Sequence, residues 1–243
     1  MTSFLKTFLI VLLSLGFAAS SLGLAQAAKS EWWLTEGARI RLISLLTPDG
    51  TRLRAGLQIE LEKGWKTYWR TPGASGLPPQ ISFQGSRNVK SATLSFPSPQ
   101  AFSDGLGLSA GYKGTVTFPI DVELLTTGVP TTLNADGLVG ICADICVPVQ
   151  FQVGLSETGK GGSDFSVAAA LNSAASSLPG EATTTQAVTS VSVMKGGKRA
   201  LLIETEVPPL SQKVDLFVEG PVSWYLSPAR RLNHTGNRAT FEL

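Results

Sequence analysis

The residues of this 243-residue chain best suited to chemistry are its two cysteines, Cys142 and Cys146, which lie four positions apart. Two thiols at short spacing can form a disulfide, exchange it with another protein, or bind a soft metal ion. A disulfide needs Cα atoms roughly 4.4–6.8 Å apart, whereas four residues of extended chain span about 13 Å. The intervening Ala-Asp-Ile must therefore turn back if the two sulfurs are to bond.

Three interpretations of the pair are open. A loop this small removes little chain entropy, on the order of 2 kcal/mol, so a purely structural disulfide would stabilise the fold only modestly. A tight ring also tends to strain the bond and to make it easier to reduce, which favours a redox-active pair. A metal site built on two thiolates would need third and fourth ligands, and the sequence shows no obvious ones.

The remaining composition narrows the function classes. Lys and Arg total 20 against 18 for Asp and Glu, and the net charge of +2 gives no sign of a nucleic-acid partner. A single histidine, His234, removes most histidine-based metal sites, and we expect it to lie on the surface. Of the two methionines one is the initiator, so a methionine-rich copper site is not expected. No metal and no small-molecule cofactor is predicted.

The first residues have the pattern of a secretory signal peptide. Lys6 precedes an apolar run over residues 8–17, and Ala25-Gln26-Ala27 is a small-x-small cleavage pattern. This run is shorter than the ~20 residues that a membrane-spanning helix needs. We therefore expect residues 1–27 to be removed on export to the periplasm of a Gram-negative cell, leaving a soluble protein.

The next part of the chain is patterned for β-structure. Polar and apolar residues alternate over residues 38–45 and 53–61, and Pro48-Asp49-Gly50 between them is a turn signal. Further strands are predicted over residues 92–96, 115–124, 131–137 and 147–153. Many short strands separated by Gly and Pro, with almost no helical periodicity, indicate an all-β sandwich.

The last third of the chain predicts a linker and a second β-domain. Residues 156–163 are rich in Gly and Ser, and Asp164 is placed to cap a short helix over residues 165–177. Further strands are predicted over residues 188–193, 200–206, 213–218 and 239–243. The predicted plan is a signal peptide over 1–27, a main domain over 28–155, a linker with a short helix over 156–182, and a smaller β-domain over 183–243. The strand-like end suits either a complete edge strand or a domain cut short.

Two other segments are candidates for function or for ordinary structure. Residues 64–73 are dense in aromatic rings, which suits a sandwich core followed by a turn. Residues 96–107 form a long loop rich in Gly and Pro, which is either a connector or a functional lid.

Five motifs in order resemble one known family. They are Gly-Trp-Lys-Thr-Tyr-Trp-Arg-Thr-Pro-Gly (64–73), Gly-Leu-Pro-Pro (76–79), Phe-Pro-Ser-Pro (96–99), Gly-Tyr-Lys-Gly (111–114) and Cys-Ala-Asp-Ile-Cys-Val-Pro (142–148). Together they resemble the amino-terminal periplasmic domain of DsbD-type thiol:disulfide interchange proteins, most of all the copper-sensitivity suppressor branch, ScsB. The resemblance covers residues 31–155 well and residues 183–243 more loosely.

This resemblance implies an immunoglobulin-like sandwich with a redox-active cysteine pair. It implies that Cys142 and Cys146 take electrons from a membrane-embedded thiol reductant, a DsbD- or ScsB-type transmembrane domain. The pair would pass them to periplasmic thioredoxin-fold proteins, an activity of the protein-disulfide reductase type. Two sets of residues would support the site. They are a shielding cap loop of Phe102, Ser103, Asp104, Gly105 and Leu106, and the nearby aromatic residues Tyr68 and Trp69.

The chain departs from the family pattern in two ways, and two functions other than electron relay remain open. The best-known members have a longer spacer between the cysteines, so fine geometry does not carry over. The chain also lacks the transmembrane and thioredoxin domains of full-length members, so we expect a separate electron source or a fragment. A non-catalytic exported binding or scaffold module with a structural disulfide is one alternative. The other is a copper-tolerance protein that binds Cu(I) through the two thiolates.

Overall fold

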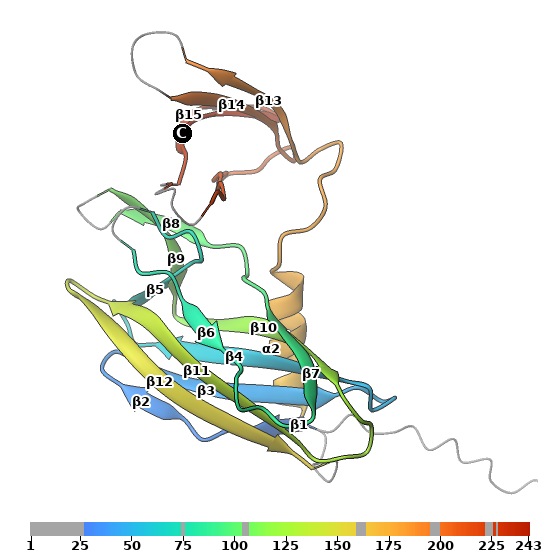
Figure 1. Cartoon of the computed structure of the whole chain (residues 1–243). Helices are drawn as coiled ribbons and strands as arrows, with labels where there is room; N and C mark the ends of the chain where they lie inside the picture. Colours follow the sequence, from blue (N-terminus) through green and yellow to red (C-terminus); the bar gives the residue numbers. More distant parts are fainter. Residues whose placement is uncertain are drawn as a thin grey trace, which may run out of the picture.

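The structure, a computed structural model, describes residues 27–73, 76–103, 107–158, 164–194, 200–221, 226 and 228–243. Within these ranges the chain forms three antiparallel sheets and one helix (Figure 1). The predicted all-β fold, a sandwich followed by a short helix and a smaller β-region, is confirmed. The predicted signal peptide lies outside the described residues except for Ala27. No helix in the described ranges combines the length and apolar character needed to cross a bilayer.

Two sheets form the sandwich. Sheet A has the order β1-β3-β4-β10-β7, with β2 paired to β3. Its strands are β1 (Ala27–Lys29), β2 (Trp33–Thr35), β3 (Ala38–Leu46), β4 (Arg52–Leu61), β7 (Val89–Leu94) and β10 (Thr115–Leu124). Sheet B has the order β12-β11-β5-β9-β8, with β6 paired to β11. Its strands are β5 (Lys66–Tyr68), β6 (Gln80–Ser82), β8 (Gln100–Ser103), β9 (Leu108–Lys113), β11 (Thr131–Cys142) and β12 (Cys146–Glu157).

Alternating side chains from both sheets build the core of the sandwich. In β12 every second residue from Val149 to Leu155 is buried, and the residues between them are exposed. Period-two burial of this kind is what a strand with one wet face produces. In β4 the run from Ala55 to Ile59 is buried on both faces, because the helix α2 (Phe165–Ser176) covers the outside of sheet A through Val167 and Leu171.

The predicted helix and its cap are confirmed. The Asp164 carboxylate accepts hydrogen bonds from the backbone N–H groups of Ser166 and Val167, which would otherwise lack partners at the helix start. Lys29 of β1 forms an ion pair with the same carboxylate. The hydrogen bond from Lys29, followed by those from Ser166 and Val167, holds the pKa of Asp164 well below its usual range. The helix is therefore tied to the first strand of the sandwich.

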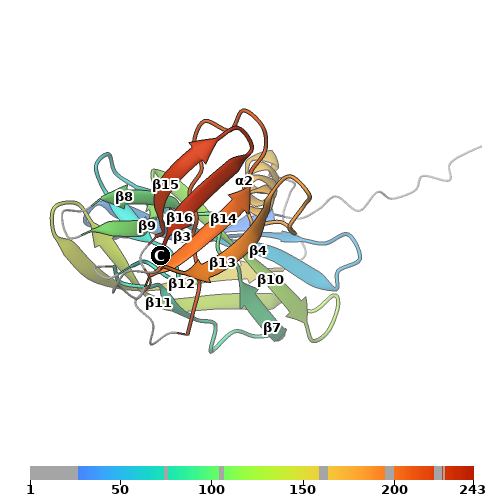
Figure 2. The same ribbon diagram turned by 90° about the horizontal axis from the view of Figure 1, so that it is seen from above.

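The third sheet lies at one end of the sandwich, beyond β8 and β9 (Figures 1 and 2). Its order is β13-β14-β16-β15. Its strands are β13 (Ala187–Val193), β14 (Leu201–Glu206), β15 (Arg230–Thr235) and β16 (Arg238–Glu242). A small core around Ile203, Ala239 and Phe241 supports it.

The prediction of a strand over residues 213–218 is wrong, although the alternation of polar and apolar residues on which it was based has a structural cause. Val214, Leu216 and Val218 pack on the small C-terminal core, whereas Phe217 packs on the core of the sandwich. The segment thus faces two cores with alternate residues but pairs with no strand of the described chain. β15, which the pattern did not predict, pairs with β16 at the edge of this sheet.

Candidate functional site

The two cysteines close the tip of the β11–β12 hairpin. Cys142 ends β11, Cys146 begins β12, and the two are Cα partners 4.1 Å apart and joined by a disulfide. Between them the backbone N–H of Ala143 donates to the carbonyl oxygen of Ile145 at 3.2 Å. The spacer therefore turns back, as the spacing argument required.

The two sulfur-bearing residues differ in exposure. Cys142 is fully buried, whereas Cys146 is exposed at the start of β12. Ile145 and Val147 on either side of Cys146 are 77% and 40% exposed. A large molecule can therefore reach the disulfide from the Cys146 side and not from the Cys142 side.

Tyr68 brings a hydroxyl group to the disulfide. Lys66 is the Cα partner of Cys142, so the side chains of Lys66, Tyr68 and Cys142 share one face of sheet B. We call this the outer face, because the alternate residues Ile141 and Thr67 point the other way, and Ile141 enters the core. Tyr68 is only 1% exposed, and its Oη lies 3.1 Å from the Sγ of Cys146. Since a disulfide sulfur carries no hydrogen, the tyrosine hydroxyl donates.

Glycines on both neighbouring strands make room for the Tyr68 ring. A Cβ on Gly140 of β11 would lie 3.1 Å from the ring, and one on Gly76 would lie 2.8 Å from it. A Cβ on Gly111 of β9, the Cα partner of Tyr68, would lie 2.1 Å from the carbonyl oxygen of Thr67. The ring can lie over the sheet because the residues beside it have no side chains.

Tyr68, Phe102 and the partly buried Leu77 cover Cys142. The Phe102 ring centroid lies 6.2 Å from that of Tyr68, and Phe102 is 9% exposed. Of the predicted cap loop, Phe102 therefore lies at the cysteine pair, and the next residue, Ser103, is exposed at the end of β8. Asp104, Gly105 and Leu106 lie outside the described residues.

Trp69 lies away from the disulfide, although it follows Tyr68 in the chain. It is buried in the sandwich core, and its ring meets the edge of Phe217 at a centroid distance of 5.8 Å. The next residue, Arg70, forms an ion pair with Glu219 at 2.5 Å. Trp69 and Arg70 thus connect the sandwich to the C-terminal region.

Several site residues were not singled out by the sequence analysis. They are Lys66, Gly76, Leu77, Gly111, Lys113 and Gly140. All except Gly140 lie within motifs quoted for the family resemblance, and Gly140 comes two residues before the first cysteine. The motifs themselves were therefore the available signal.

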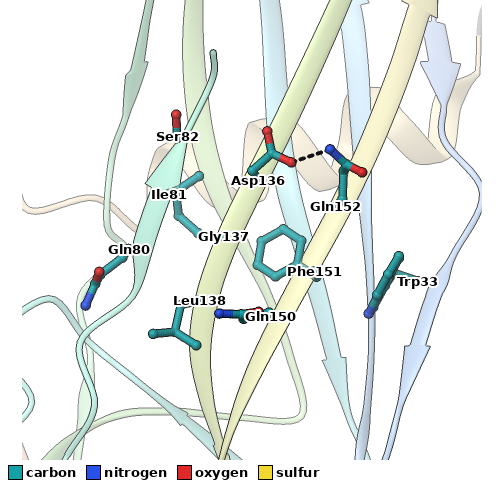
Figure 3. A pocket seen from close by; sticks show the side chains of 10 residues that line it. All are labelled: Trp33, Gln80, Ile81, Ser82, Asp136, Gly137, Leu138, Gln150, Phe151 and Gln152. Carbon is teal, nitrogen blue, oxygen red and sulfur yellow. Dashed lines mark hydrogen bonds between the residues drawn. The ribbon is translucent and has the colours of Figure 1, made fainter. Parts of the chain in front are cut away.

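Farther along the outer face of the hairpin, away from the disulfide, lies a groove of about 710 Å³ (Figure 3). The pairs Leu138–Gln150 and Asp136–Gln152 lie along this face, and Gln152 Nε2 donates to Asp136 Oδ1 at 2.6 Å. We call these four residues the open end. The covered end is Gly140 and Cys142 with the side chains of Tyr68, Leu77 and Phe102 above them. Trp33, Gln80, Ile81, Ser82, Gly137 and Phe151 complete the lining of the groove.

No group of three or more His, Cys, Asp or Glu side chains is placed to hold a metal in the described ranges. A Cu(I) ion at the reduced pair would therefore have two sulfurs as its ligands from this part of the chain. His234 lies in β15 of the third sheet and is partly buried rather than fully exposed.

Comparisons with known proteins agree with this fold. Residues 38–156 match the family model of the thiol:disulfide interchange protein DsbD, N-terminal. The fold is similar to the crystal structure of the N-terminal periplasmic domain of ScsB from Proteus mirabilis, with a TM-score of 0.70 and 20% identity. That alignment covers 88% of this chain and 83% of the other chain. A search of curated proteins found no match.

Proposed function

We propose that residues 38–156, which match the DsbD N-terminal family model, form a thiol:disulfide interchange domain whose Cys142–Cys146 pair relays electrons between proteins. The observation that carries the proposal is the unequal exposure of two bonded sulfurs. Exchange needs one sulfur that another protein can reach and a second that remains close enough to close the ring. Cys146 suits the first role and Cys142 the second.

The forward half-reaction starts from the reduced pair. The Cys146 thiolate attacks one sulfur of a partner disulfide, a mixed disulfide forms, and the other partner sulfur leaves as a thiolate. Cys142 then loses its proton and attacks the Cys146 sulfur. This step restores the Cys142–Cys146 bond and releases the partner as a dithiol, so two electrons pass to the partner.

The same geometry serves reduction of the pair. A thiolate of the electron donor attacks Cys146, because Cys142 is buried, and Cys142 leaves as the thiolate. A second donor thiolate then attacks the donor sulfur of this mixed disulfide, which closes the donor disulfide and releases Cys146 as a thiolate. We propose a membrane-embedded thiol reductant as the donor and periplasmic thioredoxin-fold proteins as the acceptors. The family model and the similarity to a periplasmic ScsB domain support this assignment.

Tyr68 and the covered end support the exchange in different ways. The Tyr68 hydroxyl, 3.1 Å from Cys146 Sγ, can donate a hydrogen bond to the thiolate that forms on reduction. Phe102 and Leu77 keep water and small thiols away from Cys142. We therefore assign Tyr68 as a positioning residue that stabilises the attacking sulfur, and Phe102 as part of the shield.

A trapping experiment tests the assignment of the two sulfurs. The reduced Cys142→Ala and Cys146→Ala variants are mixed with an oxidised thioredoxin-fold protein, quenched with acid, and separated without reductant. Cys142→Ala should accumulate a mixed disulfide, because Cys146 can attack and nothing resolves the product. The amount of mixed disulfide trapped by Cys146→Ala should be at least about tenfold smaller, because the buried Cys142 is its only thiol. Equal trapping by both variants would refute the division of roles, and no trapping by either would refute the relay.

A purely structural disulfide explains the geometry less well. The bond closes the tip of a hairpin whose strands already pair without a bulge from Thr131–Glu157 to Cys142–Cys146. A three-residue loop at such a place adds on the order of 2 kcal/mol. A purely structural role also does not explain why Cys146 is exposed.

A further inference from the structure

Two lysines stand beside the covered end. Lys66 of β5 and Lys113 of β9 are Cα partners, so two positive charges lie directly opposite each other on the sheet. Their ammonium nitrogens lie 5.0 and 5.5 Å from the centroid of the Phe102 ring. Neither belongs to any ion pair in the described part of the chain. Like charges placed opposite each other destabilise a sheet, so this arrangement has a cost that local ion pairing does not offset.

The lysines lie next to the reactive bond. Lys66 is the Cα partner of Cys142 on β11 and shares the outer face with it. Tyr68, two residues along the same strand, contacts the Cys146 sulfur. The Phe102 ring packs against Cys142 on one side, and the ammonium groups of Lys66 and Lys113 lie over the same ring. A partner that reaches Cys146 therefore comes within range of both ammonium groups.

The residues next to Cys146 in the chain are mainly apolar. Ile145 and Val147 are exposed there, and the turn carries one acidic side chain, the exposed Asp144. The rim of the accessible sulfur thus has a cationic side made by β5 and β9 and an apolar side made by the hairpin tip. Interfaces match such features with an apolar surface and with charges of opposite sign.

On the basis of the exchange role proposed above, we propose that this rim selects protein partners that carry carboxylates beside their reactive disulfide. The hairpin tip inserts Ile145 and Val147 against an apolar surface of the partner. Lys66 and Lys113 then face the partner's carboxylates. The lysines act on approach and on orientation of the attacked disulfide, while the sulfur chemistry stays with the cysteine pair.

A matched series of small disulfides tests this selection. The fully reduced protein is reacted with dithiodipropionate, hydroxyethyl disulfide and cystamine, which are of similar size and carry two negative, zero and two positive charges. The second-order rate constants are measured at about 10 mM and about 500 mM salt. At low salt, the ratio of anionic to cationic rate constants should fall about tenfold in the Lys66→Gln, Lys113→Gln double variant. High salt should reduce the wild-type ratio in the same direction.

The controls separate charge from folding and from chemistry. The Lys66→Arg, Lys113→Arg variant keeps both charges and should retain the wild-type ratio. Asp144→Asn removes a negative charge and should raise the ratio about twofold to threefold. An unchanged ratio in the double Gln variant, with the hydroxyethyl disulfide still reacting, would overturn the selection alone. Failure of all three disulfides to oxidise the wild-type pair would instead refute the exchange role.

Discussion

The covered end and the open end of the β11–β12 hairpin share one backbone, yet the outward residues of β11 are buried only at the covered end. Along β11, Asp136 and Leu138 are partly exposed, whereas Gly140 and Cys142 are buried on the same face. The strand pairing runs through both ends without a bulge. The difference comes from the neighbouring strands, which place Tyr68 and Phe102 over one end only. The covering side chains, and not a change in strand pairing, therefore distinguish the site from the rest of the sheet.

The same comparison explains why the covered end depends on missing side chains. Its lid is an aromatic ring that lies against the sheet, and this requires Gly76, Gly111 and Gly140 around Tyr68. The open end has ordinary polar side chains on the outer face and a hydrogen bond between Asp136 and Gln152. Substitutions at the two ends should consequently have very different effects.

The largest difference is expected for glycine substitutions. In Gly111→Ala the new Cβ would lie 2.1 Å from a backbone oxygen, which cannot move without shifting β5, so we expect a loss of about 3 kcal/mol in the free energy of unfolding. In Gly154→Ala on β12 the nearest atom is the Asn134 side-chain oxygen at 2.8 Å, which can rotate away. We expect a loss below about 1 kcal/mol there. Urea unfolding of both oxidised variants measures the two losses in the free energy of unfolding. Equal losses would contradict the expected difference.

Removing the lid should make the covered end behave like the open end. Phe102→Ala takes away the ring that packs against Cys142. In the reduced Cys146→Ala background, where Cys142 is the remaining thiol, we expect alkylation by iodoacetamide to accelerate about tenfold. Leu138→Ala at the open end is the matched control and should leave the alkylation rate within about twofold. Similar acceleration by both variants would mean that Cys142 is exposed by general loosening of the sheet.

A smaller effect is expected when Tyr68 loses only its hydroxyl. Tyr68→Phe keeps the ring but removes the donor to Cys146 Sγ, so the thiolate is less stabilised and exchange with hydroxyethyl disulfide should slow about fivefold. Stopped-flow measurement of the reduced variants gives the rate constants. An unchanged rate would show that the hydroxyl has no part in exchange.

Tyr112→Phe is the control for that variant. Burial raises the pKa of Tyr112, so its hydroxyl stays protonated and donates to the Pro97 carbonyl oxygen at 2.8 Å. Tyr112 lies in the core of the sandwich, one residue from Gly111 and on the opposite face. We expect Tyr112→Phe to lower the free energy of unfolding by about 1 kcal/mol and to leave the exchange rate unchanged.

The sequence predicted the long strands better than the short ones, for a physical reason. The segment 115–124 was predicted with the bounds that β10 has, because ten residues give alternation enough repeats to stand out. β5 has three residues and β9 contains a glycine, so neither has enough alternating residues to indicate a strand. Yet β5 and β9 carry Tyr68, Lys66 and Lys113. The best-predicted strands build the scaffold, and the least predictable ones carry much of the candidate site.

The site could be predicted only in part, because residue spacing alone does not show on which face of a sheet a side chain lies. The cysteine spacing required a turn and a close approach, and the hairpin provides both. Tyr68 and Trp69 were equivalent in the sequence, but adjacent residues of an extended chain point to opposite sides. One therefore contacts Cys146 and the other enters the core. Which one does so depends on the pairing of Lys66 with Cys142, a long-range contact.

The smallest effect is expected at the open end itself. Asp136→Ala removes the acceptor for Gln152 Nε2, an exposed cross-strand contact, so the free energy of unfolding should fall by less than about 0.5 kcal/mol. The rate of exchange with hydroxyethyl disulfide should also stay the same, because the groove lies along β11 and β12 away from the hairpin tip. Slower exchange with a protein partner, at an unchanged rate with the small disulfide, would show that the groove contributes to docking. In that case the two ends would form one continuous recognition surface, and the contrast between them would concern only the chemistry at the sulfurs.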